Sequence, residues 1–252
     1  MEIKSESEIN NKFKNALNKL VLLDYDGTLV NLTAKPDKAK LTLEITDIIR
    51  RLISQRGTEI FIITGRRHED IDRFLDHIPI NIIAEHGAII KENGKWKNQE
   101  LISDSWKKSV IPVMNQISDS CPGSFIEEKI YSLAWHYRNA ESDDGYSSSR
   151  ELIRILTNII GPCNLKILDG NKVVEILSDS IGKGRAVKKL DEQNIYDFIL
   201  SIGDDATDEE MFEYFQNHPN AYTIKVGDGE TSAKYKLNDI SEVVSLLKKM
   251  SG

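Results

Sequence analysis

Hydrophobic and polar residues form blocks along the chain that predict strands and helices in turn. Short apolar runs closed by turn residues predict buried strands at Leu20–Leu23, Glu59–Ile63 and Asn81–Ala84. Apolar residues recur at helical spacing from Leu41 to Ile53, and a second helix is predicted from Thr64 onward. This β-α-β-α-β order predicts a parallel sheet with helices on its faces.

The pattern changes near residue 88, where Asn93-Gly94 signals a hairpin. From about residue 103 the chain reads helix, strand, strand, twice over, as expected of a small α+β domain with an antiparallel sheet. The parallel pattern returns at Gly182 and includes buried strands at Phe198–Ile202 and Ala221–Val226. We therefore predict an α/β fold: a Rossmann-like three-layer core with a parallel sheet (residues 1–101 and 181–252) and an inserted α+β domain (residues 102–180).

Composition narrows the functional classes. The 252 residues carry 33 basic and 40 acidic side chains, a net charge of −7, so no basic face for nucleic acid is indicated. Cys121 and Cys163 show neither metal-type spacing nor a disulfide framework. The first 20 residues lack the apolar core of a signal peptide, and no apolar run approaches a membrane span. We expect a cytoplasmic monomer that binds neither nucleic acid nor membrane.

Polar clusters follow the buried strands at the points where ligands bind in open parallel sheets, outside the carboxyl ends. Four clusters are expected to converge at one edge of the sheet: Asp24-Tyr25-Asp26-Gly27-Thr28, Thr64-Gly65-Arg66-Arg67, Gly182-Lys183-Gly184 and Gly203-Asp204-Asp205. Asp24 and Asp26 lie two residues apart, so in an extended backbone their carboxylates point the same way and repel each other. Such a pair needs a cation, a shared proton or open water.

Each cluster also has a purely structural reading. Asp-x-Asp-Gly-Thr is compatible with a plain turn, Thr64 with a helix cap, and Lys183 with a solvated lysine. Gly203-Asp204-Asp205 reads equally as a turn before a helix in which Thr207 and Glu210 form a capping box. Four such clusters at four successive strand or helix ends favour a functional site over four coincidences.

The chemistry of these side chains points to phosphoryl transfer. Carboxylates without Cys or His ligands suit Mg²⁺, a hard cation. A threonine at a helix N-terminus, an arginine and a lysine suit a phosphate dianion. A carboxylate next to both can act as a nucleophile and form an aspartyl-phosphate.

The same residues carry a family resemblance. Asp24-Tyr25-Asp26-Gly27-Thr28-Leu29, Thr64, Lys183 and Gly203-Asp204-Asp205 resemble the four motifs of the haloacid dehalogenase superfamily, in order. The segments that resemble trehalose-6-phosphate phosphatases more narrowly are Ile63–Arg66, Ala84–Gly87, Ala134–Arg138, Val173–Glu175 and Gly203–Glu209. The chain departs from that pattern at Ala206, where an arginine is common, and at Ile176-Leu177-Ser178 after Glu175.

The resemblance implies a Mg²⁺-dependent phosphatase acting on a sugar phosphate, with the inserted domain as a cap. Asp24 would be the nucleophile and a metal ligand, and Asp26 the general acid and base that lends its backbone carbonyl to the metal. Thr64 and Lys183 would hold phosphoryl oxygens, with Gly65 and Arg66 beside them. Asp204 and Asp205 would ligate Mg²⁺, with Asp208 supporting them. The implied sugar-binding residues are Glu127, Lys129, Arg138 and Glu175.

Other functions remain open at this point. The sugar phosphate could instead be sucrose phosphate, mannosyl-3-phosphoglycerate or glucosylglycerol phosphate. A phospho-receiver signalling module combines similar residues, but it is about half this length and needs no inserted domain. An inactive phosphatase-like partner is disfavoured because Asp24, Asp26, Lys183 and Asp204 are all present.

Overall fold

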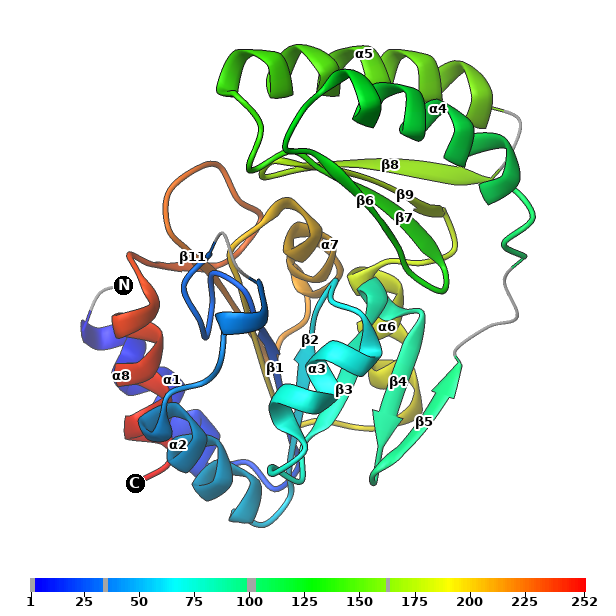
Figure 1. The fold of residues 1–252 in the computed structure, drawn as a ribbon. Coiled ribbons are helices and arrows are strands. Elements are labelled where there is room, and N and C mark those ends of the chain that lie inside the picture. The colour runs from blue at the N-terminus through cyan, green and yellow to red at the C-terminus, as the bar shows by residue number, and fades with distance from the viewer. Residues whose placement is uncertain (1–2, 34–35, 99–102, 162–163) are drawn as a thin grey trace. The chain divides into compact units, whose positions relative to one another are not determined.

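The computed structural model describes residues 3–33, 36–98, 103–161 and 164–252. The chain divides into two compact units, which are drawn in Figure 1. Unit 1 comprises Met1–Gln99 and Gly182–Gly252, and unit 2 comprises Glu100–Ile181. The insertion predicted at residues 102–180 falls inside unit 2. The predicted α/β class, with its parallel sheet, is confirmed.

Unit 1 is built on an eight-stranded sheet in the order β12-β11-β10-β1-β2-β3-β4-β5. The first six of these strands run parallel, and β4 and β5 add an antiparallel hairpin at one edge. The strands are β1 (Lys19–Asp24), β2 (Thr58–Ile63), β3 (Asn81–Ala84), β4 (Ile89–Glu92), β5 (Lys95–Asn98), β10 (Phe198–Gly203), β11 (Ala221–Val226) and β12 (Tyr235–Leu237).

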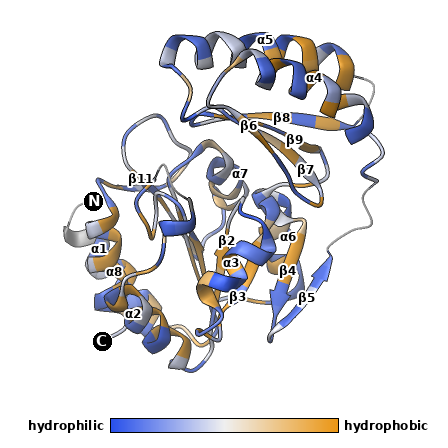
Figure 2. Cartoon of the chain, in the orientation of Figure 1, coloured by the Kyte–Doolittle hydropathy of each residue, from blue (hydrophilic) through white to orange (hydrophobic). Residues whose placement is uncertain are grey.

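Helices cover both faces of this sheet because its central strands are apolar on both sides. Val21 and Leu23 pack into one core with α1 (Ile3–Asn15), α2 (Leu43–Ser54), α3 (His68–Leu75) and α8 (Ile240–Met250). Leu20 and Leu22 pack into the opposite core with α6 (Lys183–Gln193) and α7 (Ala206–Phe215). Figure 2 shows the central strands mainly in the hydrophobic colour and the helices in both colours, as expected of a three-layer arrangement.

Unit 2 has its own sheet and core. Its strands β6 (Phe125–Glu128), β7 (Ser132–His136), β8 (Leu165–Gly170) and β9 (Val173–Ser178) pair antiparallel in the order β6-β7-β9-β8. Helices α4 (Lys107–Ser120) and α5 (Ser142–Ile160) lie on one face of this sheet (Figure 1). They pack on Leu133, Trp135, Val174 and Ile176, so the alternate residues of the same strands are left for the other face.

Most predicted elements are present, with differences at their ends. The helix predicted from Thr64 begins only at His68. The terminal helices α1 and α8 were not predicted. Cys121 is a buried free thiol, whereas Cys163 lies outside the described residues. No helix within the described ranges is both long and apolar enough to cross a membrane.

Candidate active site

Asp24 ends β1 at the carboxyl edge of the eight-stranded sheet. All six residues of β1 are buried, and Asp24 pairs in register with Ile63 of β2. The apolar run therefore carries a carboxylate into the interior, where its charge needs compensation. The next two motifs follow the neighbouring strands: Thr64 follows β2, and Asp204 follows β10, the strand on the other side of β1.

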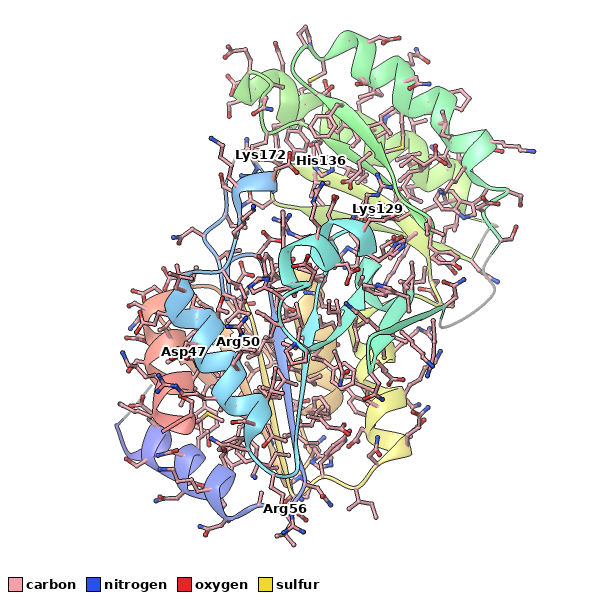
Figure 3. The ribbon with its side chains drawn as sticks, turned by 60° about the horizontal axis from the view of Figure 1, so that its bottom comes forward. Asp47, Arg50, Arg56, Lys129, His136 and Lys172 are labelled. Carbon is pink, nitrogen blue, oxygen red and sulfur yellow. The ribbon has the colours of Figure 1, made fainter. Side chains whose placement is uncertain are left out.

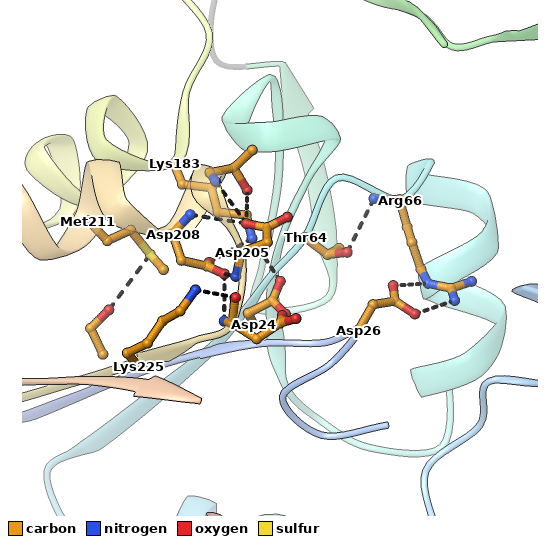
Figure 4. A network of polar contacts seen from close by, with 12 residues as sticks. Asp24, Asp26, Thr64, Arg66, Lys183, Asp205, Asp208, Met211 and Lys225 are labelled. Carbon is orange, nitrogen blue, oxygen red and sulfur yellow. Dashed lines mark hydrogen bonds and ion pairs between the residues drawn. The ribbon is translucent and has the colours of Figure 1, made fainter. Parts of the chain in front are cut away.

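Lys183 compensates part of this charge. It is the first residue of α6, and its ammonium lies 2.7 Å from Asp24 Oδ1 and 2.8 Å from Asp208 Oδ1 (Figure 4). All three side chains are buried. Burial alone would lower the pKa of Lys183, but Asp208 and Asp24 raise it well above its usual value. Lys183 is therefore a permanent cation, and the solvated-lysine reading is wrong.

One lysine does not neutralise all the carboxylates at this edge. Oxygen atoms of Asp24, Asp204 and Asp208, called the acidic group below, lie within 4.8 Å of one another. Burial raises the pKa of Asp24 to about 8 against the opposing charge of Lys183, and nearby Asp205 and Asp204 raise it further. Burial and the charges of Asp205 and Asp208 raise the pKa of Asp204 to about 7. The arrangement is short of positive charge.

Two carboxylate oxygens of the acidic group are suited to binding a cation. Asp24 Oδ2 and Asp204 Oδ1 are buried and accept no hydrogen bond from the described residues. The Asp204 carboxylate packs directly on Gly27, whose φ is +84°, and a Cβ there would lie 2.0 Å from Asp204 Oδ2. Glycine is therefore required for β1 and β10 to bring their carboxylates together. Bare carboxylate oxygens without sulfur or imidazole partners fit a hard divalent cation.

The aspartates that follow β10 make different contacts. Asp205 caps α7 by accepting hydrogen bonds from the backbone N–H groups of Thr207 and Asp208. Asp208 in turn accepts from the backbone N–H of Asp205 at 3.0 Å. The capping box is thus formed by Asp205 and Asp208, and the predicted pairing of Thr207 with Glu210 is wrong. Asp208, expected only to support the metal ligands, belongs to the acidic group, whereas Asp205 does not.

Asp26 is held by an arginine. Arg66 Nε and Nη2 each donate to its carboxylate at 2.6 Å, a bidentate pair visible in Figure 4. The guanidinium also lies over the rings of Tyr25 and Phe74. Burial would lower the pKa of Arg66, but its hydrogen bonds to Asp26 raise it. Arg66 therefore holds both carboxyl oxygens of Asp26 in this conformation.

Thr64 is buried between β2 and the start of α3, and its hydroxyl accepts a hydrogen bond from the Arg66 backbone N–H at 3.2 Å. The helix-cap reading of Thr64 is wrong, because Arg67 occupies the N-cap of α3 without a side-chain cap. Gly65 meets the imidazole of His86, to which a Cβ would come within 2.4 Å.

The turn Glu85–Gly87 belongs to this edge but was not among the predicted site residues. Glu85 and His86 adopt left-handed φ values of 49° and 57°, which non-glycine residues rarely do. The His86 backbone N–H donates to the Thr64 carbonyl, and a Cβ on Gly87 would lie 2.9 Å from the Gly182 carbonyl. The turn therefore packs against both the Thr64 loop and the start of α6. Polar residues directly after a buried strand were the available signal.

The residues predicted to bind sugar lie in unit 2. Lys129 Nζ is 2.8 Å from Glu175 Oε1, and Ser132 donates to the same oxygen. His136 Nε2 is 2.8 Å from Glu127 Oε2, and the His136 ring stacks on Phe125. These residues, Glu127, Lys129, Ser132, His136 and Glu175, form the polar cluster of unit 2; Figure 3 labels Lys129 and His136.

Arg138 stands outside the polar cluster of unit 2. Its side chain donates to the Asn171 carbonyl at 2.7 Å. Within unit 1, the geometry supplies a buried carboxylate beside a fixed cation, a group of carboxylate oxygens that could hold a divalent ion, a hydroxyl, and a second carboxylate bound to an arginine. These are the groups that phosphoryl transfer needs.

Comparison with protein families places this arrangement in a known context. The family model described as trehalose-phosphatase matches residues 22–241. The chain is 37% identical over 250 residues to alpha,alpha-trehalose-phosphate synthase [UDP-forming] B of Dictyostelium discoideum, covering 97% of this chain and 32% of that protein. It is also 37% identical to the bifunctional trehalose-6-phosphate synthase/phosphatase of Thermoproteus tenax, covering 99% of this chain and 34% of that protein. The chain thus spans about a third of the length of these relatives.

Two solved structures have a fold similar to that of this chain. The C-terminal domain of Candida albicans trehalose-6-phosphate phosphatase superposes with a TM-score of 0.92 at 26% identity, covering 98% of this chain and 96% of that one. An Aspergillus fumigatus trehalose-6-phosphate phosphatase superposes with a TM-score of 0.71 at 27% identity, covering 98% of this chain and 97% of that one.

Proposed function

Because this chain belongs to the trehalose-phosphatase family, we propose that it hydrolyses the phosphomonoester of trehalose 6-phosphate to trehalose and inorganic phosphate. One observation carries the proposal: Asp24 is buried beside Lys183, and the charge of Lys183 does not compensate all the carboxylates around it. A carboxylate nucleophile in a metal-assisted phosphoryl transfer needs such a site, where a metal ion supplies the remaining positive charge. The alternative substrates within the same chemistry are other sugar phosphates.

We propose Mg²⁺ as the cofactor. The unpartnered oxygens of Asp24 and Asp204, with Asp208 beside them, would hold it, and the Asp26 carbonyl and Asp205 are the further predicted ligands. When bound, it would neutralise negative charge on the acidic group and on the phosphoryl oxygens. Lys183 serves the same end, because its ammonium is fixed before substrate arrives.

In the first step, an Asp24 carboxylate oxygen attacks phosphorus. A new oxygen–phosphorus bond forms, the bond from phosphorus to the sugar oxygen breaks, and the sugar oxygen takes the bonding pair and a proton. Asp26 supplies that proton and is left as a carboxylate. Since Arg66 binds both Asp26 oxygens in this conformation, the step requires the Asp26 carboxyl group to turn from the arginine toward the sugar oxygen.

In the second step, ionised Asp26 accepts a proton from water, and the water oxygen attacks the aspartyl-phosphate. The bond between Asp24 and phosphorus breaks, and Asp24 is regenerated as phosphate leaves. Thr64 and Lys183 hold phosphoryl oxygens throughout, as hydroxyl and ammonium donors. Uncatalysed phosphate-monoester hydrolysis is so slow that enzymes accelerate it by up to on the order of 10²¹-fold, so fixed charges must act together here.

We propose unit 2 as the cap that selects the sugar. Glu127, Lys129, Arg138 and Glu175 present carboxylate, ammonium and guanidinium groups suited to hydroxyls. In unit 1, we propose Gly65 and Arg66 as the substrate-binding residues next to Thr64, with Arg66 able to reach anionic oxygen when it is not bound to Asp26. The monomeric state and the cytoplasmic location stay predictions.

A panel of sugar phosphates, assayed for phosphate release with EDTA and with Mg²⁺, tests the proposal. We expect Mg²⁺-dependent release with a preference for trehalose 6-phosphate. A preference for sucrose phosphate, mannosyl-3-phosphoglycerate or glucosylglycerol phosphate would reassign the substrate. An aspartyl-phosphate that persists far beyond seconds, without turnover, would favour a receiver-like role instead.

A further inference from the structure

Lys225 lies in β11, a strand whose six residues are all buried. It pairs in register with Gly203, the last residue of β10. Its neighbours Ile224 and Val226 join the core with α1, α2 and α8, so Lys225 faces the opposite side, which α6 and α7 cover. Lysine is almost never buried without a partner, so the position of Lys225 requires a specific contact.

That contact is the backbone of a residue in the acidic group. The Lys225 ammonium donates a hydrogen bond to the carbonyl oxygen of Asp204. Figure 4 labels Lys225 and draws a dashed line from its nitrogen. The Asp204 backbone N–H donates to Asp208 Oδ2 at 2.9 Å. The backbone of Asp204 is therefore held at both its N–H and its carbonyl. Its side chain, by contrast, has an oxygen with no hydrogen-bond donor among the described residues.

We propose that Lys225 is a positioning residue that orients the Asp204 carboxylate for binding a divalent cation. This inference rests on the proposed function, because it concerns the same cation. Lys225 acts by fixing the Asp204 carbonyl, and with it the backbone from which the Asp204 carboxylate extends. Groups that support metal ligands in this way typically change metal affinity about 10–100-fold when they are removed.

The test compares Mg²⁺ dissociation constants of the full chain, measured by calorimetry without substrate. We expect K225M to bind Mg²⁺ about 10–100-fold more weakly than the unsubstituted chain. We expect K225R to recover part of this loss, because a guanidinium also donates to a carbonyl. Melting in EDTA is recorded in parallel, and K225M should retain a cooperative transition.

Lys234 provides a matched control. It also donates from its ammonium to backbone carbonyls, those of His218 and Ala221, but Ala221 begins β11 whereas Lys225 lies near its end. We expect K234M to leave the Mg²⁺ dissociation constant within about twofold of the unsubstituted value, whatever it does to the melting temperature. An equal loss of Mg²⁺ affinity in K234M would assign the effect to general loosening of β11 and overturn the inference.

Each remaining outcome decides the question. A folded K225M that binds Mg²⁺ as tightly as the unsubstituted chain overturns the role of Lys225. If K225M does not fold, K225Q and K225R are compared instead, and unchanged affinity in K225Q overturns it equally. A chain that binds Mg²⁺ but releases no phosphate from any sugar phosphate refutes the proposed function without touching the Lys225 inference.

Discussion

Each unit contains a cluster of lysine and carboxylate side chains, and the two clusters differ in how far the carboxylate charge is compensated. In unit 1, Lys183 faces Asp24 and Asp208 while Asp204 adds a further carboxylate, and the pKa of Asp24 rises to about 8 through burial and neighbouring carboxylates. In unit 2, the Lys129 ammonium lies 2.8 Å from one carboxylate, that of Glu175.

The adjacent pair in unit 2 is balanced in the same way. Burial would raise the pKa of Glu127, but its hydrogen bond from His136 and the charge of Lys129 lower it. The comparison fits the roles proposed for the two regions: a surplus of buried carboxylates suits a cation, whereas a carboxylate that already has a basic partner suits the neutral hydroxyl groups of a sugar.

The largest expected effect comes from Asp24→Asn. We expect kcat for phosphate release to fall by at least on the order of 10⁴-fold, because the amide is no nucleophile. The melting temperature in EDTA should hold or rise above pH 8, where Asp24 is ionised and its charge repels the other carboxylates of the acidic group. Asp47→Asn is the control, because Asp47 is an exposed partner of Arg51 on α2 (Figure 3). Near-normal turnover by Asp24→Asn would refute the nucleophile.

Removing the metal ion tests whether the acidic group carries more negative charge than its surroundings compensate. Because the pKa values of Asp24 and Asp204 are raised to about 8 and about 7, the metal-free folded state binds protons that the unfolded state has already lost. Stability in EDTA should therefore fall as pH rises from about 6 to about 8. Excess Mg²⁺ should stabilise more at the higher pH, because it competes with protons.

Melting curves at several pH values, with EDTA and with Mg²⁺, measure this difference. We expect the increase in melting temperature on adding Mg²⁺ to grow by several degrees between pH 6 and pH 8. An increase that is constant with pH would show that the carboxylates of the acidic group are already ionised without metal, and would weaken the contrast between the two clusters.

A moderate effect is expected from Lys129→Met in unit 2. The substitution leaves Glu175 without its ammonium partner at 2.8 Å, and we expect KM for trehalose 6-phosphate to rise about 10–100-fold with kcat less affected. Hydrolysis of p-nitrophenyl phosphate, which has no sugar, should change little.

Arg150→Met is the control for this prediction, because Arg150 forms a half-exposed pair with Asp169. It should leave both substrates unaffected. If Lys129→Met lowers activity on both substrates equally, the polar cluster of unit 2 does not select the sugar.

The smallest effect concerns Glu127 and His136. Since the pKa of Glu127 is lowered in the folded protein, its stabilising contribution is present above the unfolded value near 4.3 and is lost as pH falls through the folded value. Glu127→Gln should therefore lower the melting temperature by a few degrees at pH 7 and by less at pH 3.5. A difference that does not shrink with acid would assign the effect to packing.

Much of the fold could be predicted because it depends on local periodicity. The apolar runs at β1, β2, β10 and β11 are buried strands. Ligands bind at the carboxyl ends of parallel strands, and this rule led us to predict that Asp24, Thr64, Lys183 and Asp204 lie at one edge of the sheet. Helix α8 carried the needed signal in Val243, Leu246, Leu247 and Met250, whereas among residues 6–15 of α1 only Ile9 and Phe13 are buried. Such a sparse stripe becomes a helix through its contacts with α8.

The contacts that each site residue makes could be identified only from the tertiary structure. Asp204, Asp205 and Asp208 are chemically identical, and nothing in their spacing says which caps α7 and which faces Lys183. The bonds from Arg66 to Asp26, from Lys225 to the Asp204 carbonyl and from Lys129 to Glu175 join residues 40, 21 and 46 positions apart. The sequence determined which chemical groups the protein has and at which strand ends they stand. Only the folded chain decided their partners, because charge compensation in a buried site depends on distances that local periodicity does not encode.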